Sequence, residues 1–305
     1  MNVTDFMRKR FLKDYSIPCN IWNNEELFLE RLDFLDKWYG CKKAYKDLEN
    51  MLKDFDSEKN FIEYYEEVKN KAIACIKESE GFKRFNEDKE IQNFDKIEGI
   101  TKKDIYNKNF VNFSYMSIDL VQANFQALKM YSDDIFKGFN KYEDFIKQFT
   151  DYAYIINSKY IRQVVFGNCN PRRQIKYMES IMTDIYKNLL KSCVMNNLEL
   201  VSLNHDELIF RIKDSSSTLN LCQTVAIELS NFSEFILAVS VFDLESMPIS
   251  GYVKVGEKNI FKCLNPDTAV LDVKRYLNMD ITENDMIFNK DGSLCKYLAV
   301  PNRKY

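Results

Sequence analysis

The chain has 305 residues, 46% hydrophobic and 29% charged, with a formal net charge of −3. This composition fits a folded globular protein and excludes a strongly basic, tail-like nucleic-acid binder, although 43 lysines and arginines are available for local basic patches. The lone histidine, His205, excludes sites that need two histidines, and eight scattered cysteines without a CxxC pair are typical neither of zinc sites nor of disulfide scaffolds.

Neither a membrane span nor a secretory signal is expected. No run of about 18 apolar residues occurs. The first fifteen residues are charged and lack the apolar stretch of a signal peptide. We therefore expect an intracellular (cytoplasmic) protein that does not associate with a membrane.

The first hundred residues are predicted to be helical. Apolar residues recur at three- and four-residue steps in 27–39 and again in 61–76, and lysines and glutamates flank both segments. This pattern predicts a helical hairpin that packs on the rest of the chain. A role of the same hairpin in gripping DNA is compatible with the pattern but is not demanded by it.

The pattern changes near residue 110. Residues 110–119 alternate and are rich in aromatic side chains, which predicts a strand that ends at Asp119. Residues 141–165 are predicted to be helical. Pro171 then begins a long amphipathic helix that ends at Asn196 and Asn197.

A β-hairpin is predicted after this helix. Its arms are 198–203 and 206–212, both apolar, and its tip holds His205 and two acids. Further along, 216–229 is predicted to be a helix, 235–242 and 251–264 are predicted to contain strands, and 289–292 is predicted to be a turn. The sequence therefore predicts an α+β fold.

Asp119 and Asp206 stand at the ends of two predicted strands that one sheet can bring together. Phosphoryl transfer at a nucleotide uses two divalent ions about 3.5–4 Å apart. Magnesium prefers a few hard carboxylate ligands and keeps several waters. The pair could hold such ions, but acids are common at strand ends, so two unrelated acids are the alternative.

Four segments resemble motifs of family A DNA polymerases, in the family's order. Leu-Asn-His-Asp-Glu-Leu-Ile-Phe at 203–210 resembles the third palm motif, and Ile-Asp-Leu-Val-Gln-Ala-Asn-Phe at 118–125 resembles the first. Between them, Asn-Pro-Arg-Arg-Gln at 170–174 resembles the segment that leads into the helix before His-Asp-Glu. Residues 159–167 look like a degenerate nucleotide-binding fingers helix. The resemblance covers roughly 110–255.

The resemblance implies a right-hand polymerase fold. A helical thumb-like region would occupy 1–108, an antiparallel palm sheet 109–261 with reduced helical fingers inserted at about 130–195, and a small β-containing extension 262–305. The implied protein is a compact phage- or plasmid-type member without an exonuclease domain. It would transfer nucleotides from nucleoside triphosphates to the 3′ end of a DNA primer–template, with two Mg²⁺ or Mn²⁺ ions. Whether a protein accessory factor is needed stays open.

The resemblance also assigns residue roles, position by position. The catalytic and metal-binding group is Asp119, the Leu120 carbonyl, Asp206 and the supporting Glu207. The nucleotide-binding group is Asn124, Lys159, Arg162 and Phe166, with Phe166 near the incoming base. The primer- and template-binding group is His205, Gln174, Arg172 and Arg173.

Several positions depart from the family pattern. The spacing from Lys159 to Phe166 is one residue shorter, Phe166 replaces a tyrosine, and Ile155 stands where an arginine is usual. Asn124 occupies the position of a glutamate that blocks the ribose 2′ hydroxyl. Two alternatives therefore stay open: a nucleotidyltransferase with relaxed template or sugar choice, and a non-catalytic, polymerase-derived module that binds nucleic acid or protein.

Overall fold

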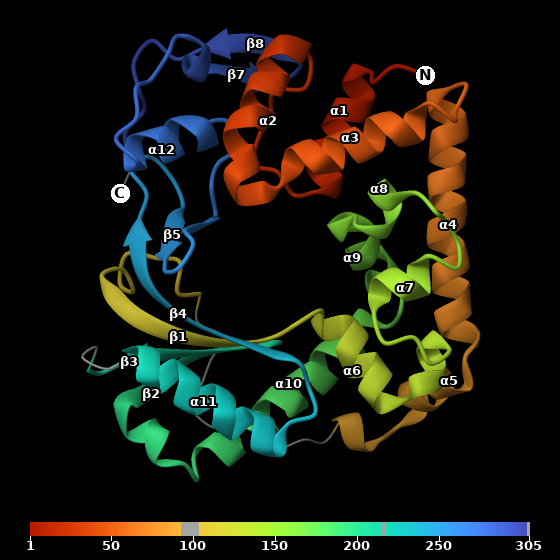
Figure 1. Cartoon of the computed structure of the whole chain (residues 1–305), viewed down its shortest axis with the longest axis vertical. Coiled ribbons are helices and arrows are strands. Elements are labelled where there is room, and N and C mark those ends of the chain that lie inside the picture. Colours follow the sequence, from red (N-terminus) through yellow and green to blue (C-terminus); the bar gives the residue numbers. More distant parts are fainter. Residues whose placement is uncertain (93–103, 215–217, 304–305) are drawn as a thin grey trace.

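The computed structural model describes residues 1–92, 104–214 and 218–303, and within them the protein has the α+β architecture that the sequence predicts. The N-terminal helices α1–α3 lie beside α12, β7 and β8 at one end of the molecule (Figure 1). A sheet backed by α10 and α11 lies at the other end, and α4 runs between the two ends (Figure 1). Within the described residues, no helix combines the length and the apolar character needed to cross a membrane.

Five helices make up the N-terminal region: α1 (Asp5–Asp14), α2 (Glu25–Tyr39), α3 (Cys41–Leu52), α4 (Glu58–Glu78) and α5 (Glu80–Glu87). A Thr, Asn or Ser side chain accepts a backbone N–H at the start of four of them, α1, α2, α4 and α5, as expected of N-caps. Gly40, at φ 58°, ends α2 and turns the chain into α3. The two predicted N-terminal helices thus form as α2 and α4.

The predicted hairpin of these two helices is wrong. Helix α3 follows α2 directly, and α4 instead packs against α5 and α9 (Figure 1). The sequence pattern identified the apolar face of each helix but not the element that packs against it, because the apolar face of any other element can cover it. The segment 141–165 also differs from expectation, because it forms three short helices, α7 (Tyr142–Ile146), α8 (Ala153–Ile156) and α9 (Lys159–Gly167).

The main sheet has six antiparallel strands in the order β2-β3-β1-β4-β5-β6. They are β1 (Phe113–Leu120), β2 (Leu198–Asn204), β3 (Glu207–Ile212), β4 (Leu237–Ser246), β5 (Tyr252–Val255) and β6 (Ile260–Lys262). The predicted strand ending near Asp119 and the predicted hairpin are confirmed. Apart from the helices inserted between β1 and α10, the chain order β1, α10, β2, β3, α11, β4 and the strand order match the split βαβ arrangement.

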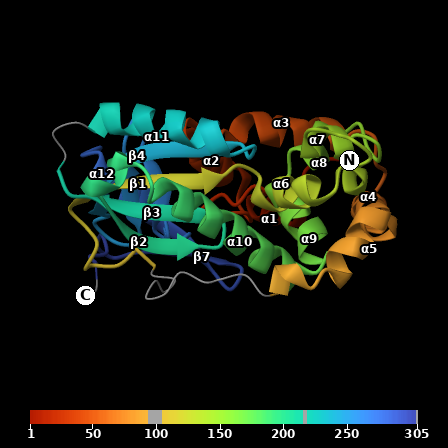
Figure 2. The ribbon, with the colours of Figure 1, turned by 90° about the horizontal axis from the view of Figure 1, so that it is seen from below.

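The two faces of this sheet differ. Helices α10 (Pro171–Leu189) and α11 (Thr218–Phe232) cover one face (Figure 2). Their apolar side chains share a core cluster with Met116, Ile118 and Phe210. The predicted helix 216–229 corresponds to α11, although 216 and 217 lie outside the described residues. Because side chains alternate along a strand, Ser117 and Asp119 belong to the opposite face.

A second core joins the N-terminal helices to the segment after β1. Aromatic residues from α1, α2 and α4 share one apolar cluster with those of α7, α8 and α9. Helix α6 (Ala123–Tyr131) and the short 3-10 helices η1 (Glu90–Gln92) and η2 (Asp133–Phe136) border it. The expected limits at 108 and 130 therefore do not separate two cores.

The C-terminal segment consists of α12 (Ala269–Tyr276), the 3-10 helix η5 (Asn284–Met286) and the hairpin β7 (Ile287–Lys290) and β8 (Ser293–Lys296). Asp291 and Gly292, both at positive φ, make the predicted turn.

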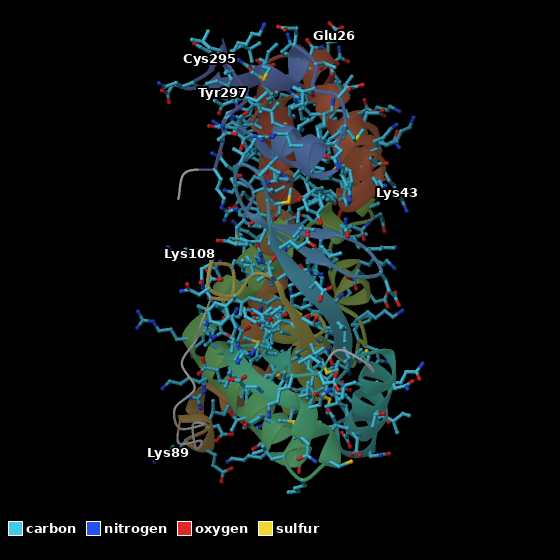
Figure 3. All side chains as sticks on the ribbon, turned by 90° about the vertical axis from the view of Figure 1, so that its left-hand side faces the viewer. Glu26, Lys43, Lys89, Lys108, Cys295 and Tyr297 are labelled. Carbon is cyan, nitrogen blue, oxygen red and sulfur yellow. The ribbon has the colours of Figure 1, made fainter. Side chains whose placement is uncertain are left out.

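Another 3-10 helix, η3 (Cys193–Asn197), directly precedes β2 of the main sheet. Cys295 and Tyr297 lie at the opposite end of the molecule from Lys89 (Figure 3).

A buried ion pair fastens this segment to α2. Arg31 Nη1 donates to Asp285 Oδ1 at 2.9 Å, and Lys274 Nζ donates to Asp285 Oδ2 at 2.7 Å. Burial alone would raise the pKa of Asp285, but hydrogen bonds from Lys274 and Thr282 and the charge of Lys274 hold it below its usual value. A lowered folded-state pKa stabilises the fold above the ordinary pKa, and this stabilisation is lost as the pH falls below about 4.

We expect Asp285→Asn to lower the free energy of unfolding by about 3 kcal/mol, because it leaves the Arg31 guanidinium buried without its carboxylate. Urea unfolding at pH 7 measures the change. Glu283→Gln is the matched control, since the Glu283 side chain is 84% exposed and its pair with Lys296 lies in solvent. Equal effects of the two substitutions would contradict the assigned role of Asp285.

Candidate functional site

The sheet brings the two predicted acids together. In the antiparallel register of β1 and β3, Asp119 stands opposite Glu207. The Leu120 backbone N–H donates to the Asp206 carbonyl oxygen at 2.9 Å, which joins the end of β1 to the β2–β3 turn. The predicted proximity of Asp119 and Asp206 is therefore confirmed.

Both aspartates are half-buried, and their surroundings disfavour negative charge. Burial, and then the charges of Asp206 and Glu207, raise the pKa of Asp119 to about 6 against the opposing effect of Lys254 and Lys262. Burial also raises the pKa of Asp206, and Glu207 adds to this effect, while the backbone N–H of Asp206 itself and His205 oppose it. Asp119, Asp206 and Glu207, which we call the carboxylate cluster, thus carry more negative charge than the neighbouring lysines offset. This excess favours a bound cation.

Glu207 is held in place by two buried neighbours. Ser117 Oγ donates to Glu207 Oε1 at 2.5 Å, and Lys254 Nζ donates to the same oxygen at 3.2 Å. Ser117 is 2% and Lys254 8% exposed. Sequence reasoning missed both residues, although a lysine inside the apolar strand segment 251–264 is a signal of a paired, buried charge. Glu207 is accordingly positioned by these contacts next to Asp119.

The donor chemistry of this cluster fits a hard divalent cation. Two aspartate carboxylates and the Leu120 carbonyl are oxygen ligands, which Mg²⁺ and Mn²⁺ prefer. In the described ranges, no group of three or more His, Cys, Asp and Glu side chains is arranged to hold a metal ion. Mg²⁺ is often held by one or two carboxylates, with substrate phosphates and waters completing its shell.

His205 lies in the tight turn of the β2–β3 hairpin, at φ 46°. Its Nδ1 is 3.0 Å from Glu179 Oε1 on α10. The contact ties the imidazole to the helix that backs the sheet, which fixes the ring orientation at the hairpin tip. The turn position of His205 was expected, whereas its partner Glu179 was not.

Helix α9 carries the predicted nucleotide-binding cations. Arg162 Nη1 is 3.8 Å from Glu143 Oε1, and Gln122 Nε2 donates to the same oxygen at 2.8 Å. These contacts connect α9 to α7 and to the chain just beyond β1. Burial lowers the pKa of Lys159, and the nearby charges of Lys262 and Arg162 lower it further. Lys262, on β6, is the second lysine, after Lys254, that the sequence analysis did not identify.

Three predicted site residues belong to the core instead. Phe166 is 2% exposed, and its ring packs on Tyr142 and Phe136 with centroids 5.7 and 6.2 Å away, so it is not a platform for a base. Gln174 Nε2 donates to the Phe166 carbonyl at 2.9 Å from a buried position. Arg173 is buried and donates to backbone carbonyls of α5 and of the segment after it.

These corrections share one cause. The first turn of α10 is wedged between α9 and α5, so its inward side chains satisfy carbonyl groups at the ends of those helices. Arg172 is exposed and lines a hollow together with Asn170 and Lys176, so it remains accessible to a phosphate. Asn124, in the first turn of α6, is half-buried, and its predicted role stays a prediction.

Comparisons of the chain with protein-family models, with curated proteins and with solved structures found no match. The functional interpretation therefore depends on the geometry and charges of the carboxylate cluster and the cations around it.

We expect Asp119→Asn to raise the free energy of unfolding by about 1–2 kcal/mol at pH 7.5 in the presence of EDTA. A carboxyl whose folded-state pKa is raised destabilises the fold when ionised, and this cost develops as the pH rises from about 4 to about 6. The gain should therefore vanish near pH 4. Urea unfolding at the two pH values measures it.

Asp184→Asn, on the exposed side of α10, is the control for the loss of a surface carboxyl. Added Mg²⁺ should stabilise the wild-type protein more than Asp119→Asn, because ligand binding to the folded state alone raises its stability. A gain for Asp119→Asn that is independent of pH would contradict the charged cluster.

Proposed function

We propose that the protein is a template-directed nucleotidyltransferase, a small DNA polymerase that extends a primer 3′ end. The observation that carries this proposal is the contact between the end of β1 and the β2–β3 turn, which sets Asp119 beside Asp206. Two carboxylates held close together, here one on a strand and one in the adjoining tight turn, suit two-metal phosphoryl transfer.

The layout of the chain supports the proposal. The α10–α11 layer covers one face of the sheet (Figure 2), and by alternation along β1 Asp119 belongs to the other. The helices α7–α9 are inserted between β1 and α10 and lie away from the α10–α11 layer (Figure 1). Helix α9 carries Lys159 and Arg162, and the charge of Lys262 on β6 acts on Lys159. A palm with acids and a facing element with cations are the two parts that a right-hand polymerase places around a nucleotide.

The reaction joins the primer 3′ oxygen to the α-phosphorus of a nucleoside triphosphate. The bond from this phosphorus to its leaving oxygen breaks, and pyrophosphate departs. Divalent ions held by Asp119, Asp206 and the Leu120 carbonyl would activate the attacking hydroxyl and stabilise the charge on the phosphates. The chain's own side chains position the reacting groups: Ser117 and Lys254 hold Glu207 next to Asp119.

The remaining cations would orient the two substrates. Lys159 and Arg162 would contact the triphosphate from α9, where the family resemblance also assigns them. His205, oriented by Glu179, would contact the primer end at the hairpin tip. Arg172 would contact the nucleic-acid backbone, where phosphate contacts fix register without reading sequence.

The cost of the acidic cluster argues against a non-catalytic descendant. Without a cation, burial and the neighbouring acids raise the pKa of Asp119, so the ionised cluster destabilises the fold. Retaining such a cluster has no structural advantage.

A relaxed choice of sugar is favoured by Asn124, because a neutral amide at this position excludes a ribose 2′ hydroxyl less effectively than a glutamate does.

We expect Asp206→Asn to reduce primer extension at least about a thousandfold, because it removes a ligand of the ions that stabilise the transferring phosphoryl group. The assay uses a labelled DNA primer on DNA and on RNA templates, with either nucleotide pool and with Mg²⁺ or Mn²⁺. Asp184→Asn should extend the primer like the wild type. Full activity in Asp206→Asn would refute the two-metal assignment, and extension by neither protein under any condition would refute the polymerase proposal.

Asn124→Glu should shift the preference toward deoxynucleotides by about tenfold or more, since a longer, charged side chain competes for the space and hydrogen bonds of a 2′ hydroxyl. Single-nucleotide incorporation with ribo- and deoxyribonucleotides gives the ratio of kcat/KM values. Asn124→Gln separates size from charge. An unchanged ratio in Asn124→Glu would remove Asn124 from the sugar site.

A further inference from the structure

Strands β5 and β6 place two lysines on the acid-bearing face of the sheet. Lys262 pairs with Tyr252 in the antiparallel register, and Lys254 lies two residues beyond Tyr252 on the same strand. Alternation along both strands puts Lys254 and Lys262 on one face. Since Lys254 reaches Glu207, this is the face that also bears Asp119.

The two lysines differ in how their charges are satisfied. The Lys254 ammonium is paired with Glu207 and lies 4.3 Å from the centroid of the Phe242 ring. Across the part of the chain that the structure describes, Lys262 has no acidic side chain within ion-pair distance, and the same holds for Lys159. Lys254 therefore supports the acids, whereas Lys262 and Lys159 have positive charge to offer a ligand.

These two lysines approach each other from opposite elements. Lys262 and Arg162 lie close enough to Lys159 for their charges to act on its ammonium group. Lys262 also lies close enough to act on Asp119. Lys262 thus lies within electrostatic reach of both Asp119 on the sheet and Lys159 on α9, and the repulsion between the two lysines is relieved when an anion lies between them.

Lys262 is mounted on a rigid strand. The neighbouring Phe261 is buried and packs edge-on against Trp38 of α2, with ring centroids 5.3 Å apart. Gly251, at φ 70°, lies so near β6 that a Cβ there would be 2.5 Å from the Lys262 carbonyl oxygen. The backbone of Lys262 is therefore fixed, as a preorganised binding residue requires.

We infer that the polyphosphate of a nucleotide substrate binds between Lys262 of β6 and Lys159 and Arg162 of α9. Carboxylates and two lysines without an ion-pair partner in the described residues, Lys159 and Lys262, belong to this region. A complex of a divalent cation with a polyphosphate satisfies both kinds of group, because its cation meets the carboxylates and its oxygens meet the lysines. A nucleic-acid phosphodiester carries one charge per phosphate and brings no such cation. This inference rests on the proposed function and extends it by assigning Lys262 as a phosphate ligand on the sheet.

The test measures the affinity of the full chain for inorganic tripolyphosphate in the presence of Mg²⁺ by isothermal titration calorimetry. Lys262→Gln should weaken binding about tenfold, similar to Lys159→Gln, because each removes one charge-assisted contact. Lys258→Gln, exposed in the β5–β6 loop, is the matched control and should bind within about twofold of the wild type. Lys262→Arg should restore most of the affinity.

Wild-type affinity in Lys262→Gln, or no tripolyphosphate binding by the wild type, would overturn the inference. So would a Lys262→Gln variant that loses affinity for a single-stranded oligonucleotide but not for tripolyphosphate. The two proposals fail separately. Lys262-dependent binding without primer extension leaves the polyphosphate site standing and refutes the polymerase, whereas extension with an unchanged nucleotide KM in Lys262→Gln refutes only the site.

Discussion

The pairing of β1 with β3 is the constraint on which the candidate site depends. One residue of slip in this register would turn Asp119 toward the α10–α11 layer and bury it among apolar side chains. The apolar residues Met116, Ile118 and Phe210 prevent that slip, because they must face the helices. Core packing and the placement of the acids are therefore two results of the same alternation.

The charged side chains near this strand pair form two groups of opposite sign. Asp119, Asp206 and Glu207 concentrate negative charge on β1 and the hairpin, while Lys159 and Lys262 bring unpaired positive charge from α9 and β6. Lys254 offsets part of the negative charge through its ion pair with Glu207. A ligand that carries a cation and an anion as one complex would lower the electrostatic cost of both groups of charges, which is the reason for the proposed polyphosphate site.

Local patterns predicted much of this site, and tertiary packing decided the rest. The hairpin, its His-Asp-Glu tip and the strand before Asp119 follow from alternation over a few residues, so they could be read from the sequence. The roles given to Phe166, Gln174 and Arg173 failed because a short helical segment does not reveal which of its sides other helices cover. Lys254 and Lys262 were missed because the antiparallel pairing that aligns them with Asp119 joins distant parts of the chain.

The ion pair between Arg31 and Asp285 spans 254 positions, so it closes nearly the whole chain into a loop. Bringing such distant residues together carries a large entropic cost that earlier, more local contacts must first reduce. During synthesis from the N-terminus, α2 emerges long before its partner segment exists. The apolar side of α2 can pack early on α1 and α3, but the Arg31 guanidinium stays without its buried carboxylate partner until Asp285 has been made.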